Sequence, residues 1–156
     1  MHSPDSIQQV AAFHTVFQHP ILPQPAIPDS KRCKLRVDLL AEELKELQEA
    51  IHEKNIVEIA DALCDLQYVL SGAILEFGLG EKFKSLFEEV HRSNMSKSCA
   101  TEAEAQATVL HYFEKDGTTS YYKEIDGKYL VFRKEDNKTL KSVNYSPASL
   151  ENILNQ

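Results

Sequence analysis

The sequence predicts a mainly α-helical protein with a small β-structured end, and three observations predict this class. Apolar residues recur at helical spacing through most of the first 115 residues. Capping and breaking signals divide that part into separate helices with short connections. Beyond it, short runs rich in Tyr, Val and Phe alternate with Asp-Gly and Asp-Asn pairs, which is typical of a β meander. We therefore expect a helical domain over residues 1–115 and an appendage over residues 116–156.

A first helix is expected over residues 4–18. Ser3 is the expected N-cap, Pro4 suits the first helical position and Asp5 makes the first turn acidic. Residues 19–28 hold four of the six prolines, so this stretch is expected to be an extended, stiff loop.

A second helix, capped by Asp29 or Ser30, is expected to continue to about residue 54. A third is expected from residue 55 or 56 to the glycine-containing break at residues 77–80. Because the turn between them is very short, the two helices should pack antiparallel.

A fourth helix is expected over residues 81–98, and Thr101 to Glu104 has the pattern of a capping box for a short helix to about residue 114. Three strands are then expected, within residues 121–122, 129–132 and 139–145. The pair Ser146-Pro147 should begin a closing helix that continues through Leu154.

Composition narrows the classes of function. The chain has 156 residues, enough for one modest core, and a formal net charge of −7 with a pI near 5.4. That charge argues against nucleic acid or anionic membranes as partners, because both need clustered Lys and Arg. No apolar run approaches membrane-spanning length, and three scattered cysteines without a Cys-x-x-Cys pair indicate reduced thiols. We expect a soluble, cytoplasmic protein.

Two acidic motifs are the most informative feature of the sequence. Glu42-Glu43-x-x-Glu46 lies in the second expected helix, and Glu58-x-x-Asp61 follows in the third after eleven intervening residues. Side chains three positions apart lie on one face of a helix, so each motif aims a pair of carboxylates in one direction. On antiparallel neighbours the two pairs can converge.

These acids are expected at the edge of the core rather than in open solvent. Glu43 borders the apolar stripe of the second helix, which is formed by Leu40, Leu44, Leu47 and Ile51. The third helix is apolar around most of its circumference, through Ile56, Ile59, Ala60, Leu63, Leu66, Leu70 and Ile74. Its polar remainder is one narrow line of Glu58, Asp61, Asp65 and Tyr68.

No Lys or Arg occurs between Asn55 and Glu81, so the third helix offers its acids no cation. Clustered, partly buried carboxylates raise each other's pKa, and a hard divalent cation such as Mg²⁺ relieves that cost. A single Glu-x-x-Glu pair is usually a solvated face, but two facing pairs on an apolar background favour metal. Glu42 and Glu49 point toward solvent, and Asp65 is left open as an outer-sphere residue.

Two polar residues extend the apolar stripe of the fourth helix. Continuing the spacing of Phe83, Leu86, Phe87 and Val90 leads to Asn94 and then Lys97. Either the helix has left the core there and both are solvated, or an amide and an ammonium serve a phosphate group. Arg36, about two turns before Glu43, offers a second cation.

Three motifs carry a resemblance to a known family: Glu42-Glu43-x-x-Glu46, Glu58-x-x-Asp61 and Ser93-Asn94-Met95-Ser96-Lys97. With them the sequence resembles the MazG-like and phosphoribosyl-ATP pyrophosphohydrolase-like superfamily of all-α NTP pyrophosphatases. Phe13-His14-x-x-Phe17 and the proline-rich loop before Arg36 are similar to its N-terminal part. The resemblance covers roughly residues 7–98, and the interval between the acidic motifs is at the short end of the family's range.

The resemblance implies a four-helix bundle that forms homodimers or homotetramers. It implies Mg²⁺, with Mn²⁺ as a substitute, bound by Glu43, Glu46, Glu58 and Asp61. It also implies that Asn94 and Lys97 contact the nucleotide and its phosphates. The β meander and closing helix lie outside the superfamily's core, so the resemblance assigns them no role.

The expected reaction is cleavage of a nucleoside triphosphate to monophosphate and pyrophosphate in nucleotide-pool housekeeping, with Glu43, Glu46 and Glu42 as catalytic candidates. Glu42 or Glu46 would orient the attacking water. Phe13, His14 and Phe17 form either a stacking wall for the base or an ordinary aromatic core. Phosphoribosyl-ATP as substrate is one alternative, and a catalytically silent nucleotide-binding or interaction module is another.

Overall fold

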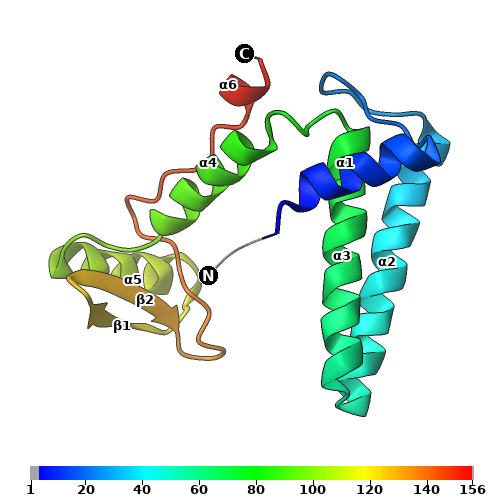
Figure 1. Ribbon diagram of the computed structural model, residues 1–156. Coiled ribbons are helices and arrows are strands. Elements are labelled where there is room, and N and C mark those ends of the chain that lie inside the picture. The colour runs from blue at the N-terminus through cyan, green and yellow to red at the C-terminus, as the bar shows by residue number, and fades with distance from the viewer. Residues whose placement is uncertain (1–3, 156) are drawn as a thin grey trace. The chain divides into compact units, whose positions relative to one another are not determined.

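The computed structural model describes residues 4–155 and shows a mainly helical protein with a small antiparallel sheet (Figure 1), which confirms the predicted class. The elements are α1 (Ser6–Phe17), α2 (Ser30–Glu53), α3 (Ile56–Glu76), α4 (Phe83–Met95), α5 (Glu102–Asp116), β1 (Ser120–Ile125), β2 (Lys128–Arg133) and α6 (Glu151–Leu154). They form two compact units, residues 1–83 and 84–156. Within the described part of the chain, no helix has the length and apolarity needed to cross a membrane.

Helices α2 and α3 begin and end where their capping signals predict. The Asp29 carboxylate accepts from the backbone N–H groups of the first turn of α2, at 2.9 and 3.1 Å. Lys54 ends α2 in the left-handed conformation, and the Asn55 side chain caps α3 directly afterwards. This two-residue turn sends the helices side by side in opposite directions (Figure 1), as expected.

Helix α1 begins later than predicted, at Ser6, because the Asp5 carboxylate accepts from Gln8 N at 3.2 Å and so acts as the N-cap. The predicted cap, Ser3, lies outside the described residues. The proline-rich stretch is extended, as expected. Its backbone is tied to the end of α3 by hydrogen bonds from Leu22 N to Leu75 O at 3.0 Å and from Ala26 N to Phe77 O at 3.1 Å.

Gly78 lets this loop approach the end of α3. Its φ of +66° is in the region that favours glycine, and a Cβ there would lie 1.9 Å from the carbonyl oxygen of Gln24. The break predicted at residues 77–80 is therefore a close packing point as well as a helix end.

The predicted apolar stripes are only partly buried. On α2 and α3, Leu44, Ile51 and Leu63 are 48%, 56% and 51% exposed, whereas the small residues Ala50 and Ala62 are buried. Period alone does not distinguish the side of a helix that meets its neighbour from a side that remains uncovered, so the prediction of a fully buried stripe is wrong for these three residues.

In residues 84–156, α5 packs on a β hairpin. Strands β1 and β2 pair antiparallel from Ser120 opposite Arg133 to Ile125 opposite Lys128. The capping box is confirmed, since Thr101 accepts from Glu104 N at 3.2 Å and the Glu104 carboxylate reaches back to Ala100 N at 2.9 Å. The core contains Cys99, Ala105, Val131 and Leu140, flanked by Val109, Tyr112, Tyr122 and Tyr129. Because α5 belongs with the hairpin, this compact unit begins at residue 84, whereas the sequence suggested a division at 115.

Two details at the end of the chain differ from expectation. The prediction of a third strand is wrong. Thr139 makes only an isolated bridge to Phe132, and residues 142–150 turn away along α4. The closing helix is a single turn that starts at Glu151. Ser146 and Pro147 do not begin it, because both contact the Arg92 guanidinium instead.

Candidate metal and nucleotide site

The acidic motifs lie on the neighbouring helices α2 and α3, and Glu43 is the residue that connects them. Glu43 is half-buried, and its pKa is raised first by burial and then by the charges of four carboxylates. Two of these, Glu46 and Glu42, are on its own helix, and the other two, Asp65 and Asp61, are on α3. Acids of both helices therefore act on Glu43, and on α3 the stronger effect comes from Asp65 rather than from a residue of the Glu-x-x-Asp motif.

The four predicted metal ligands are not equally placed. Glu46, Glu58 and Asp61 are exposed, and Glu58 is not among the groups that shift the pKa of Glu43. Asp65, which the sequence left open, acts on Glu43 more strongly than Asp61 does. Over residues 4–155, no three His, Cys, Asp or Glu side chains are grouped closely enough to hold a metal ion. The acids share one seam without forming a closed ligand cage.

The chemistry of this donor set fits Mg²⁺ better than a transition metal. All of the clustered donors are carboxylate oxygens, and Mg²⁺ binds through one or two carboxylates while keeping several waters. Burial and then the negative charges of the neighbouring acids raise the pKa of Glu43, which is the cost that a bound cation would relieve. On α2, Lys45 pairs with Glu49 at 3.3 Å, outside this group of acids.

Near the other end of the same helices lies a buried ion network. Glu76, which is 1% exposed, forms ion pairs with Arg32 and Arg36, and Arg32 Nε donates to Glu76 Oε2 at 3.0 Å. Burial by itself would raise the pKa of Glu76, but the hydrogen bonds from the two arginines outweigh it and lower that pKa. Arg36 is therefore paired with a carboxylate inside the protein, and it shares that carboxylate with Arg32.

His14 completes this network from α1. Its Nδ1 donates to the Pro20 carbonyl at 2.9 Å, which leaves Nε2 as the acceptor facing Arg36 Nη2 at 3.4 Å. Burial lowers the pKa of His14, so the ring is neutral at physiological pH. Gly72 makes room on α3, since a Cβ there would lie 2.7 Å from Arg36 Nη1.

A cavity of about 220 Å³ opens beside this network, between α1, α2 and α3. Its walls are mostly apolar and aromatic: Val10, Phe13, His14, His19, Arg32, Leu35, Arg36, Leu39, Tyr68 and Val69. Among the described residues, Arg36 Nε has no hydrogen-bond partner, and the Arg36 side chain is only 8% exposed, so water does not readily replace that partner. Leu39 is one helical turn from Glu43, about 6 Å along the axis. The cavity and the acids thus occupy one seam.

The aromatic residues of this cavity only partly match the prediction. Phe13 lines it, with Tyr68 edge-on at 5.6 Å and His19 stacked at 5.7 Å between ring centroids. Phe17 packs on Phe13 at 4.4 Å but is 61% exposed and does not line the cavity. Sequence reasoning placed Tyr68 on the polar line of α3 without giving it a role, and it did not single out His19.

Asn94 and Lys97 belong to the other compact unit, residues 84–156. Asn94 is in the last turn of α4, and Lys97 follows the helix end. Lys97 Nζ donates to Asn94 Oδ1 at 2.7 Å, so the two residues act as a pair. Asn94 is exposed and Lys97 is half-buried, so neither side chain lies in the core.

Comparison of the sequence with known proteins identifies the family of this chain. The family model for phosphoribosyl-ATP pyrophosphohydrolase matches residues 10–94, which is more than half of the chain. The chain belongs to the phosphoribosyl-ATP pyrophosphohydrolase family. It is also similar to an uncharacterized protein of Acanthamoeba polyphaga mimivirus, 25% identical over an alignment of 227 positions that covers 90% of this chain and 89% of the relative.

Membership in the phosphoribosyl-ATP pyrophosphohydrolase family assigns the chain a pyrophosphohydrolase-type function on nucleotides at the level of the family. The matched residues include both acidic motifs, the buried network of Arg36 and His14, and Asn94. Lys97, the β hairpin and the C-terminal segment lie beyond the match.

Proposed function

We propose that this chain is a Mg²⁺-dependent nucleoside triphosphate pyrophosphohydrolase that releases pyrophosphate and a nucleoside monophosphate. The observation that carries the proposal is the half-buried Glu43, whose pKa is raised by carboxylates of both α2 and α3. Such a cluster attracts a hard divalent cation, and Mg²⁺ shares its sites with phosphate oxygens. The family supports hydrolysis of a nucleotide phosphoanhydride.

Glu43, Glu46, Glu58 and Asp61 would hold Mg²⁺, with Asp65 as an additional ligand or an acceptor for its waters. When bound, the metal supplies charge neutralisation for the phosphates and activation of a water. Glu42 or Glu46 orients that water for attack at the α-phosphorus. The departing group is pyrophosphate. The resemblance assigns Asn94 and Lys97 contacts with nucleotide and phosphate, for which an amide and an ammonium supply a hydrogen-bond donor and a point charge.

The cavity between α1, α2 and α3 is suited to the base. Phe13 and Tyr68 offer aromatic surface, and the Arg36 Nε donor has no hydrogen-bond partner among residues 4–155. His14 and Arg36 serve the substrate by shaping this wall rather than by supplying a free charge, because Glu76 is paired with Arg36 and burial keeps His14 neutral. Phe17 supports Phe13 from the solvent side.

The test is a pyrophosphate-release screen over canonical and modified NTPs and dNTPs with Mg²⁺ and with Mn²⁺. Glu43→Gln and Asp61→Asn should each abolish turnover while circular dichroism shows unchanged helix content. Glu49→Gln is the control, because Glu49 is an exposed acid of the same helix paired with Lys45. Turnover retained in both seam variants would refute the assignment.

Phosphoribosyl-ATP is a second candidate substrate, because the matching family model is the one described by that activity. Side-by-side turnover of phosphoribosyl-ATP and of common dNTPs separates the two candidates. A silent nucleotide-binding module would instead bind these compounds without releasing pyrophosphate from any of them.

We also propose that the chain forms a homodimer or homotetramer in the cytoplasm. Leu44, Ile51, Leu63 and Leu70 expose 42–56% of their surface on α2 and α3, which is unusual for large apolar side chains on a helical hairpin. Three free thiols support a reducing compartment. Light scattering coupled to size-exclusion chromatography measures the assembly, and a strictly monomeric chain would contradict it.

A further inference from the structure

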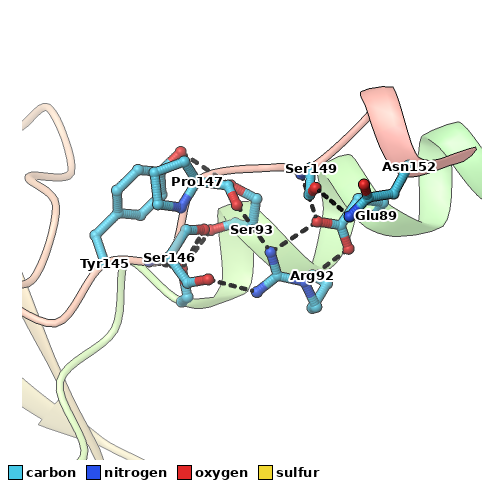
Figure 2. Close-up of polar contacts among 9 residues, drawn as sticks. Glu89, Arg92, Ser93, Tyr145, Ser146, Pro147, Ser149 and Asn152 are labelled. Atoms are coloured by element: carbon cyan, nitrogen blue, oxygen red, sulfur yellow. Dashed lines mark hydrogen bonds and ion pairs between the residues drawn. The ribbon is translucent and has the colours of Figure 1, made fainter.

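The C-terminal segment is held on α4 by a dense set of polar contacts (Figure 2). Arg92 donates to Ser146 Oγ and to the Pro147 carbonyl, both at 3.0 Å. Ser149 N donates to Glu89 at 2.8 Å, and the Tyr145 hydroxyl lies 2.9 Å from Ser93 Oγ. Ser96 Oγ accepts from Ser146 N at 2.9 Å. Because α6 contains no buried residue, these polar contacts help to fix residues 145–149 on α4.

The two strips of chain brought together in this way are free of acids. Residues 90–101 and 137–150 contain no Asp or Glu, in a chain whose net charge is −7, yet they carry Arg92, Lys97, Lys138 and Lys141. Four acids adjoin the ends of the strips in sequence, Glu89, Glu102, Asp136 and Glu151; Glu102 accepts from the Tyr122 hydroxyl and Asp136 pairs with Arg133. Glu89 binds Arg92 and Ser149 N, while Glu104 binds Ala100 N and the Ser142 hydroxyl.

Lys97 and Lys141 are the two unbalanced cations of this surface that lie nearest the Tyr145 ring. Ser142 N donates to Lys97 O at 3.2 Å, which brings the peptide next to Lys141 against the end of α4. Lys141 Nζ lies 4.3 Å from the centroid of the Tyr145 ring, and Lys97 Nζ contacts the neutral Asn94 amide. Among the residues that the structure describes, neither ammonium has a carboxylate within 4.0 Å.

The Tyr145 hydroxyl reports the same positive field. Its pKa is lowered, first by the hydrogen bond with Ser93 and then by the charges of Lys141, Lys97 and Arg92. Three cations act on the Tyr145 hydroxyl, and among the described residues two of them, Lys97 and Lys141, have no carboxylate partner. Such a surface is suited to binding an oxyanion.

We propose that Lys97, Lys141, Asn94 and the Tyr145 hydroxyl form a pyrophosphate-binding site, in which two of the four groups come from the segment after the β hairpin. The two ammoniums supply charge, while the Asn94 amide, whose oxygen is taken by Lys97, and the hydroxyl supply donors. The identity of the anion rests on the proposed function, because pyrophosphate is the group that this reaction releases. The contacts of Figure 2 then have a purpose, which is to hold Lys141 and Tyr145 beside Lys97.

The experiment is calorimetric titration of the full chain with inorganic pyrophosphate in EDTA, which leaves the acidic seam without metal. Lys141→Ala should weaken binding about five- to tenfold, the loss expected for one charge-assisted contact at an exposed site. Tyr145→Phe should weaken it less, and Lys141→Arg should restore it because the charge is kept. Lys123→Ala is the matched control, since Lys123 lies 5.6 Å over the Tyr121 ring in a different part of this unit.

The outcomes separate this inference from the proposed function. If pyrophosphate binds in EDTA and Lys141→Ala weakens it while no nucleotide is hydrolysed, the anion site stands and the reaction assignment fails. If NTP turnover is present but Lys141→Ala changes neither KM nor pyrophosphate affinity, the anion site is refuted. An equal loss in Lys123→Ala would also refute it, because the effect would then be one of net charge only.

Discussion

Replacing Glu76 by Gln should destabilise residues 1–83 far more than any other single neutralisation of an acid in that unit. The Glu76 carboxylate is 1% exposed and forms ion pairs with two arginines, one of which, Arg36, has a side chain only 8% exposed. A glutamine of the same shape keeps the packing but leaves the Arg36 guanidinium buried without a counter-charge. The perturbation therefore isolates electrostatics from cavity formation.

The size of the effect follows from burial. Removing one partner of a buried ion pair costs about 3–5 kcal/mol, because the remaining charge stays desolvated and unbalanced. Arg32, with a side chain 26% exposed, can turn partly to water, but Arg36 cannot. By contrast, the Lys45–Glu49 pair has side chains 75% and 61% exposed at 3.3 Å, so Glu49→Gln should cost less than about 1 kcal/mol.

The assay is urea unfolding of the full-length variants at neutral pH, followed by far-ultraviolet circular dichroism. Because the chain has two compact units, the change should appear in one of two transitions if they unfold separately. A Glu76→Gln variant no less stable than Glu49→Gln would show that the network is not an energetic anchor, and the argument from buried charge would fail.

Three further outcomes are expected. Gly78→Ala should unfold the end of α3 at a cost of several kcal/mol, measured by the same urea titration, because a Cβ would meet Gln24 O at 1.9 Å and φ is +66°; wild-type stability would contradict it. In acid, the lowered pKa values of Glu76 and His14 mean that the unfolded chain takes up protons before the folded one does. Stability should therefore fall as pH decreases, first below the ordinary His value of 6.5 and then below the Glu value of 4.5, and thermal melts of Glu76→Gln should show a smaller second phase than wild type. Glu43→Gln should raise the metal-free Tm by about 1–3 °C, since it removes like-charge repulsion, and should abolish the stabilisation that the proposed function expects Mg²⁺ to give the wild type; a lower metal-free Tm would contradict this.

The acidic seam shows what a local pattern can predict. Residues three or four apart on a helix share a face whatever the rest of the protein does, so the spacing of Glu43, Glu46 and Asp61 was enough to place acids toward a common seam. The same spacing could not rank Asp65 against Glu58. That ranking depends on how the two helices are set along each other, which is decided by the turn at residues 54–55 and by close packing at Ala50 and Ala62.

The buried network was beyond sequence reasoning for a related cause. Arg36 had the appearance of a free cation, because its partner, Glu76, lies 40 residues away on another helix and carries no motif. Nothing local indicates that Gly72 is there to admit the Arg36 guanidinium. The third strand failed for the same reason, since residues 139–145 have strand-like composition but their polar groups find partners on α4 and α5.

Helix limits, caps, the family and the acid motifs follow from the order of residues, because they depend on interactions within a few positions of the chain. Which arginine is neutralised, where the cavity opens and which cations stay unbalanced were decided only on folding. Those properties belong to pairs of groups distant in sequence, and burial, which sets the energy of such pairs, exists only once the helices have packed.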